Sequence, residues 1–152
     1  MSYDESWRSY QDWRADDSGE EPFQAFVLYR ADLDLKTSQR TRPYSLLLSL
    51  SFLSPEPDGL YTEEEFEVLE RLDAALVDSF DAAEVFYVGR VTGGAKRFYC
   101  CYAEDGSRTA RLREEINSLE ARFPGYRTSI DEGDDAEWAI YKGSFVPEPD
   151  DG

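Results

Sequence analysis

Two runs of β-forming residues in the middle of the chain flank a pair of glycines. The runs are Val85–Thr92 and Lys96–Tyr102, and Gly93-Gly94 lies between them. Paired glycines suit a tight turn with positive φ, so this pattern is typical of a β-hairpin. The hairpin is the strongest local prediction in the sequence, and the other elements are placed relative to it.

An amphipathic helix is predicted on each side of the hairpin. The first begins after Thr62, which forms a capping-box pattern with Glu65, and continues to about Phe80. The second runs from about Ser107 to Phe123. Apolar residues recur at steps of three and four in both segments, which is the spacing of one buried helix face. These residues are Phe66, Leu69, Leu72, Leu76 and Phe80 in the first helix, and Leu112, Ile116, Leu119 and Phe123 in the second.

Three further segments are predicted to be strands: Phe23–Lys36, Tyr44–Leu53 and Tyr126–Ile130. The last six elements then follow the order βαββαβ. This order is the split pattern of a ferredoxin-like fold, in which two helices cover one face of an antiparallel sheet. We therefore predict an α+β fold with a ferredoxin-like βαββαβ core, an extra N-terminal strand and an aromatic arm.

Three parts of the chain are expected. Residues 1–22 are predicted to be an acidic aromatic arm, residues 23–147 a single α+β domain, and residues 148–152 a frayed acidic tail. The aromatic residues of the arm recur at a spacing that suits a short helix or a docked segment. We expect them to pack on the domain itself, and a partner-binding stripe is the alternative. They are Trp7, Tyr10 and Trp13.

The titratable residues restrict the possible functions. The chain has 33 Asp and Glu, 16 Lys and Arg and no histidine, which gives a formal net charge of -17. A protein this negative repels phosphate backbones, so direct nucleic-acid binding is not expected. Histidine triads, histidine acid–base pairs and histidine-ligated zinc are impossible. We predict a protein that is not an enzyme and has no cofactor or metal.

The chain is expected to be cytoplasmic. Its apolar runs, such as Leu46-Leu47-Leu48, are too short to cross a membrane, and the acidic N-terminus lacks the features of a signal peptide. The two cysteines, Cys100 and Cys101, are neighbours that would point to opposite faces of a strand. Reduced thiols are therefore expected, as in cytosolic proteins.

Acidic residues are concentrated around the first predicted helix. Residues 56–84 carry eleven acids and one base. Such a field would steer a basic partner and weaken with salt, whereas solvation and solubility are the alternative explanation. We predict that the partner is a basic protein, with nucleases among the candidates, and we leave the oligomeric state open. The acids predicted to bind it are Glu63, Glu64, Glu67 and Glu70.

A second candidate surface lies at the hairpin. Its glycines fall between two strands, so no helix N-terminus follows to receive a phosphate, and a turn is preferred to a phosphate-binding loop. A small basic patch at the hairpin tip remains a candidate for ligand or partner binding. Its residues are Arg90, Lys96 and Arg97.

The acidic segment 131–137 is the third candidate. Clustered carboxylates suggest a calcium or magnesium site, but the spacing does not match an EF-hand. We favour turn and strand-entry roles for Asp134 and Asp135, through bonds to backbone amides, and we predict no metal site. Asp134, Asp135 and the following Trp138 are kept as residues of a possible ligand or partner patch.

Several stretches of the chain, taken in order, form one pattern. They are Asp58-Gly59-Leu60, the helix from Thr62, Tyr87-Val88-Gly89-Arg90-Val91-Thr92, Arg97-Phe98-Tyr99 with Tyr102, and Asp134-Asp135-Ala136-Glu137-Trp138 with Tyr141. Their order resembles a bacterial family of unknown function, number six-nine-five, and its relatives among the RraB-like regulators of ribonuclease E. The resemblance covers roughly residues 5–147. It implies a ferredoxin-like domain without known catalytic residues and, from the RraB side, an acidic protein that binds the nuclease.

Three functions are weighed. The leading one is a regulatory or adaptor domain that binds a basic protein through the acidic helix. A related one is an immunity-type inhibitor that covers the basic groove of a nuclease toxin. The third is an enzyme or small-ligand binder that uses the acidic loop and a tyrosine-lined pocket, which would need convergent polar groups. The tyrosines in question are Tyr61, Tyr87, Tyr99 and Tyr102.

Overall fold

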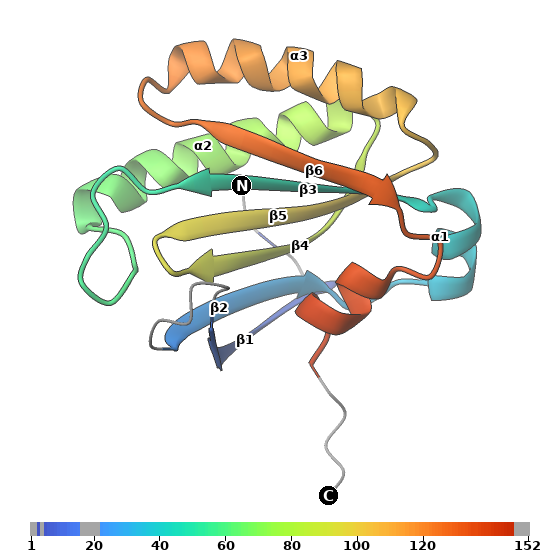
Figure 1. The fold of residues 1–152 in the computed structure, drawn as a ribbon, viewed down its shortest axis with the longest axis horizontal. Coiled ribbons are helices and arrows are strands. Elements are labelled where there is room, and N and C mark those ends of the chain that lie inside the picture. Colours follow the sequence, from blue (N-terminus) through green and yellow to red (C-terminus); the bar gives the residue numbers. More distant parts are fainter. Residues whose placement is uncertain (1–2, 4, 16–21, 148–152) are drawn as a thin grey trace, which may run out of the picture.

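The computed structural model describes residue 3, residues 5–15 and residues 22–147, so the predicted tail 148–152 lies outside the described residues (Figure 1). The strands are β1 (Trp7–Arg14), β2 (Phe23–Arg30), β3 (Tyr44–Ser51), β4 (Phe86–Gly93), β5 (Lys96–Ala103) and β6 (Thr128–Asp134). The helices are α1 (Leu35–Thr41), α2 (Glu63–Ala82), α3 (Ser107–Arg122) and a π-helical turn η1 (Tyr141–Phe145). No helix of these residues is long and apolar enough to span a membrane.

The strands form one six-stranded sheet in the order β1-β2-β4-β5-β3-β6, and every pair of neighbours is antiparallel. The α+β class predicted from the sequence is confirmed. α2 and α3 lie together on one side of the sheet, and η1 lies on the other (Figure 1).

The larger core lies between the sheet and the helices α2 and α3. Its residues come from the alternating positions of β3 and from the apolar stripes of both helices, because strands repeat every two residues and helices every three to four. This is the packing that the sequence predicted, except that Phe66 is 40 % exposed and lies outside the core. The fully buried leucines of this core include Leu46, Leu48, Leu50, Leu69, Leu72, Leu76 and Leu112.

A second core covers part of the opposite face. Trp138 is its centre: the side chain is 0 % exposed, its ring stacks on Tyr102 with centroids 4.0 Å apart, and its indole nitrogen donates to the Arg42 carbonyl at 2.8 Å. Tyr141 and Phe145 of η1 complete the cluster. The sequence analysis did not predict which segment packs on this face of the sheet. In the structure, the segment that follows β6 packs on it.

The hairpin turn differs by one residue from the prediction. Gly93 pairs with Lys96 as the last rung of the ladder, so the two turn residues are Gly94 and Ala95. Both have positive φ, at 61° and 65°, as a type I′ turn requires. The second turn position is therefore held by alanine in the left-handed region.

The N-terminal aromatic segment is a strand and not a helix or a loose arm. β1 pairs along its whole length with β2, from Trp7 opposite Arg30 to Arg14 opposite Phe23. Because side chains alternate, Trp7 packs on the larger core and Tyr10 on the second one, whereas Trp13 is 71 % exposed. The prediction that the aromatics pack on the domain therefore holds for two of the three.

Two other boundaries were misplaced. The strand predicted to reach Lys36 ends at Arg30, and α1 begins at Leu35, within the range predicted as strand. Asp34 caps α1 by accepting from the Thr37 amide at 3.2 Å. The last strand does not end at Ile130 but continues to Asp134 as β6, since it pairs with β3 as far as Tyr44. The segment predicted to be an acidic loop is thus partly an edge strand.

Candidate functional site

The outward face of α2 carries a stripe of exposed acids. Glu63, Glu67 and Glu70 follow one another at steps of four and three, so they lie on one face of the helix, and all three are exposed. Asp78 and Asp81 are exposed further along the same helix. The structure thus brings together three of the four acids predicted to bind a partner, and we call this set the acidic stripe.

A groove lies beside the acidic stripe, between the start of α2 and the end of α3. It has a volume of about 930 Å³, and Glu64, the fourth predicted acid, is one of its lining residues. Val68 and Phe123 contribute apolar surface to it, and Arg71 and Arg122 contribute positive charge. The groove is therefore mixed in character, and its acidic side is the side that continues into the stripe.

Two large apolar side chains are exposed at this end of the molecule. Leu53, which lines the groove, is 52 % exposed, and Phe66, on the first turns of α2, is 40 % exposed. Among the described residues only one other large apolar side chain, Trp13, is exposed to this degree. Exposed apolar groups next to charged ones are the usual composition of a protein-binding surface.

A buried carboxylate fixes the wall of the groove. Glu65 is 6 % exposed and accepts from the amides of Leu53 at 2.6 Å and Ser54 at 3.0 Å, as well as from the Tyr126 hydroxyl. The Thr62 hydroxyl accepts from the Glu65 amide at 3.1 Å, as the capping prediction required. In a capping box the Glu65 side chain would reach back to the Thr62 amide. Here it binds the backbone at Leu53 and Ser54, where β3 gives way to the following loop, and the sequence did not predict this role.

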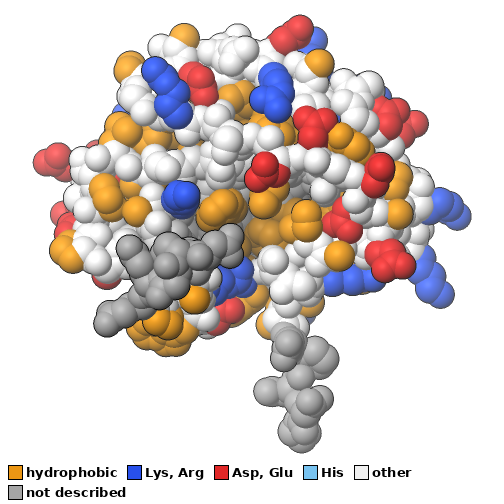
Figure 2. Space-filling view, in the orientation of Figure 1, with side chains coloured by type: hydrophobic (Ala, Val, Ile, Leu, Met, Phe, Trp, Pro, Cys, Tyr) orange, Lys and Arg blue, Asp and Glu red, His pale blue; other side chains and the backbone are white. Residues whose placement is uncertain are grey.

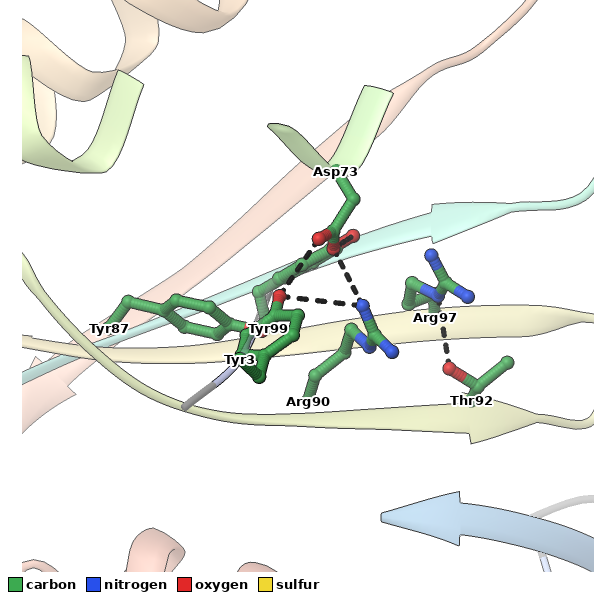
Figure 3. Close-up of polar contacts among 7 residues, drawn as sticks. All are labelled: Tyr3, Asp73, Tyr87, Arg90, Thr92, Arg97 and Tyr99. Carbon is green, nitrogen blue, oxygen red and sulfur yellow. Dashed lines mark hydrogen bonds and ion pairs between the residues drawn. The ribbon is translucent and has the colours of Figure 1, made fainter. Parts of the chain in front are cut away.

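The interface between α2 and the sheet contains a buried polar cluster (Figure 3). Asp73 accepts from the Tyr99 hydroxyl at 2.6 Å, the Tyr3 hydroxyl at 2.8 Å and the Arg90 guanidinium at 2.8 Å. The Tyr3 and Tyr87 hydroxyls lie 3.1 Å apart. We call these five residues the Asp73 cluster. The sequence held one signal for it, an acid three residues before Leu76 on the apolar side of the helix.

The pKa values of the groups in the Asp73 cluster lie far from neutral pH. Burial acts to raise the pKa of Asp73, but the Arg90 charge and the bonds from Tyr99 and Tyr3 outweigh it and hold the pKa below its usual value. Burial raises the pKa of Tyr3 to about 12 and those of Tyr87 and Tyr99 well above the ordinary tyrosine value. A general acid or base needs a pKa near the working pH, and these groups do not have one.

We expect an alkaline titration to ionise the buried tyrosines only when the fold is lost. Tyr87, Tyr99 and Tyr102 are buried, and burial raises their pKa values above the ordinary tyrosine value. A folded pKa above the unfolded one stabilises the protein fully below about pH 10, and this stabilisation is lost as the pH rises toward the folded pKa. Ultraviolet absorbance, followed together with circular dichroism, measures both events. Reversible ionisation of all ten tyrosines near pH 10 without loss of structure contradicts this expectation.

The three cations of the hairpin do not form an exposed patch. Arg97 is 2 % exposed and donates to the Thr92 hydroxyl at 3.0 Å, and Arg90 is bound to Asp73. Only Lys96 is exposed. The described residues therefore do not form the expected basic patch, because Arg90 is paired with buried Asp73 and Arg97 is buried against Thr92 and the Tyr61 ring.

The residues after β6 have structural contacts. The Asp135 carboxylate accepts from the Ala139 and Ile140 amides and from the Tyr102 hydroxyl, the last at 2.6 Å, which is the predicted turn role. Asp134 is the exposed last residue of β6, and Trp138 is buried beneath this turn. These three residues therefore do not present one surface. Within the described part of the chain, no group of three acids or cysteines is placed to hold a metal ion.

Three of the four tyrosines proposed to line a pocket fill the interior instead, and the fourth, Tyr61, is half-buried. Tyr87, Tyr99 and Tyr102 are 7 %, 1 % and 0 % exposed. A separate hollow of about 540 Å³ lies on the opposite face of the sheet, with Leu47 and Phe98 among its apolar lining and Lys96 at its edge. Figure 2 shows hydrophobic side chains gathered at the middle of this face. Its described lining has three polar side chains, those of Arg14, Lys96 and Ser144, and no carboxylate.

Comparison with protein families gives a match over most of the chain. A family model described as "Family of unknown function (DUF695)" matches residues 24–145. The matched segment begins in β2 and ends with η1, so it includes the acidic stripe, the groove and four residues of the Asp73 cluster, and it leaves out β1 and Tyr3. No curated protein matches the chain.

Proposed function

The chain belongs to this family of unknown function, and we propose that it is a non-enzymatic regulatory or adaptor protein whose α2 surface binds a basic protein. One observation carries the proposal: the acidic stripe lies beside exposed Leu53 and Phe66 and a groove. Of the surfaces described, this is the one that combines an excess of acids with accessible apolar groups.

The physical properties of this surface suit a charged protein partner. The net charge of -17 raises the rate of encounter with a basic molecule, and the acidic stripe directs that encounter to α2. The exposed apolar side chains supply surface that loses water on binding, which is the larger source of affinity in most interfaces. In this proposal the negative charge raises the rate of association with the partner, and the burial of Leu53 and Phe66 supplies most of the affinity.

The state of the interior supports a binding role over a catalytic one. The Asp73 cluster is closed and its groups titrate far from neutral pH. The thiols of Cys100 and Cys101 are each 1 % exposed, and burial raises both of their pKa values. A nucleophile must be accessible and activated, and neither thiol has these properties.

The resemblance to RraB-like regulators of ribonuclease E adds a partner class, namely a nuclease with a basic surface, and a bacterial, cytoplasmic setting. We also infer a ferredoxin-like relationship for the segment from β3 to β6, supported by its chain order of βαββαβ and its strand order β4-β5-β3-β6. An immunity-type inhibitor would use the same surface, and a neighbouring toxin gene would distinguish it from a general regulator.

Charge reversal tests the proposal. A variant in which Glu63, Glu64, Glu67 and Glu70 are replaced by lysine is expected to lose about tenfold or more of its affinity for the protein captured by the wild type. Capture from a lysate of the source cell, compared at low and moderate salt, gives the measurement. The expected loss follows from removing the steering field and the contacts of the acidic stripe.

The control variant has the same change in net charge at other exposed acids. These are Glu114, Asp131, Asp134 and Glu137, each replaced by lysine. The control should retain capture if the acidic stripe is the binding surface. Equal loss in both variants would show that total charge alone matters, and unchanged capture in both would exclude the acidic surface.

A further inference from the structure

β1 is the first strand in the order of the sheet, and none of the other described strands pairs with its outer side. In the strand order it stands first, and its partner among the described strands is β2. The Ser6 carbonyl accepts from the Ala31 amide at 2.7 Å, so the peptide groups of even-numbered residues point toward β2. The amides and carbonyls of odd-numbered residues therefore point away from the sheet. These residues are Trp7, Ser9, Gln11 and Trp13.

We propose that a second copy of this chain binds here, with the two β1 strands paired antiparallel about a two-fold axis at Tyr10. The two sheets would become one continuous sheet, and the outward peptide groups of β1 would bond to those of the other copy. An antiparallel pair of identical strands is self-complementary, as a two-fold dimer requires.

The sequence of β1 is nearly symmetric about Tyr10 in its chemistry. Antiparallel pairing about this residue places an aromatic ring opposite an aromatic ring and a base opposite an acid, and each facing pair lies on one face of the sheet. Such cross-strand pairs stabilise a sheet, whereas like charges oppose it. The facing pairs are Trp7 with Trp13, Arg8 with Asp12, Ser9 with Gln11, and Tyr10 with Tyr10.

The neighbouring registers fit less well. Faces are preserved when the axis moves by whole residues, and the nearest alternatives place it at Gln11 or at Ser9. An axis at Gln11 places Arg8 opposite Arg14, which are like charges. An axis at Ser9 places Trp13 opposite Glu5, outside the strand, and leaves Arg8 opposite Tyr10. Of these three registers, only the axis at Tyr10 pairs opposite charges within β1.

The exposure and charge of β1 also suit this partner. Trp13 is 71 % exposed, the highest value among the large apolar side chains described, and pairing covers it with Trp7 of the second copy. The strand carries Arg8, Asp12 and Arg14, so it lacks the excess of acids found on α2. Asp12 already accepts from Arg14 at 3.1 Å, which leaves Arg8 as the cation for the other copy's Asp12.

Sedimentation velocity over a range of protein concentrations tests the dimer, with a charge swap to test its register. Arg8→Asp places an acid opposite Asp12 of the other copy at both symmetry-related positions of the dimer. We expect the dissociation constant of the dimer to rise about tenfold or more. Adding Asp12→Arg to the same chain should restore dimerisation. Lys36→Asp on α1 makes the same charge change on an exposed residue and should leave the dimer intact.

Two further variants separate pairing from misfolding. Gln11→Pro removes an outward amide without breaking the β1–β2 ladder, so the dimer should be lost while the circular dichroism spectrum is kept. Tyr10→Cys should form an intermolecular disulfide, because facing residues of a non-hydrogen-bonded pair have Cα atoms about 4.5 Å apart. Cys100 and Cys101 are buried and do not compete. A wild-type protein that stays monomeric at all concentrations overturns the proposal, as does cross-linking by Gln11→Cys and not by Tyr10→Cys.

Discussion

Replacing Asp73 by alanine is expected to lower the free energy of unfolding by about 3–5 kcal/mol. Asp73 is 4 % exposed, and its carboxylate accepts hydrogen bonds from Arg90, Tyr99 and Tyr3. Its removal leaves a guanidinium at the α2 interface without its counter-charge and two hydroxyls without their acceptor. Urea unfolding followed by circular dichroism measures the change.

The exposed Asp78 on the same helix provides the control. Asp78→Ala removes the same chemical group from water-exposed surface and should change stability by no more than about 0.5 kcal/mol. A similar value for Asp73→Ala would mean that the Asp73 cluster does not stabilise the fold. Because the folded pKa of Asp73 is lowered, its contribution is present above the unfolded pKa of about 3.9 and is lost as the pH falls through the folded value. The difference between wild type and variant should therefore shrink in acid.

Trp138→Ala is the second substitution with a large expected effect, again a loss of about 3–5 kcal/mol. The ring is 0 % exposed, stacks on Tyr102 and contacts Tyr141 edge-on, so its removal leaves a cavity at the centre of the second core. Thermal or urea unfolding gives the value. The result also tests whether Trp138 has a structural role, since a residue used only to bind a partner would tolerate the change.

Two controls accompany this variant. Trp13→Ala removes the same side chain from an exposed position and should have little effect at concentrations where the protein is monomeric. Trp138→Phe keeps an aromatic ring against Tyr102 but leaves the Arg42 carbonyl without its donor, at a cost of about 1–3 kcal/mol. Equal stability of Trp138→Ala and Trp13→Ala would contradict the packing described.

The elements with strong local signals could be predicted from the sequence. The β4–β5 hairpin, α2 and α3 each carry their own turn, cap or apolar period, and the structure has all three. β1 lacked such a signal, because its aromatics at positions 7, 10 and 13 suggest a helical step while the strand is specified by pairing with β2. α1 was hidden because a seven-residue helix has too few residues to show a period.

The candidate site divides in the same way. The exposure of Glu63, Glu67 and Glu70 follows from the helix period alone, since they lie opposite its leucines. The burial of Arg97 does not follow from the local sequence, because arginine is usually exposed and its burial here depends on which face of β5 packs against α2. Tyr3 illustrates the same limit, for its partner Asp73 is 70 residues away in the chain.

Cys100 and Cys101 belong to different cores, although they are neighbours in β5, because the β4–β5 hairpin is the wall between the two layers. If either core loses its packing, one face of the β4–β5 hairpin is exposed to solvent, and the hairpin can then no longer hold the other core in place. The two layers should consequently open together, as one cooperative unit. The amide protons at the centre of the hairpin would then exchange with solvent deuterons only through global opening.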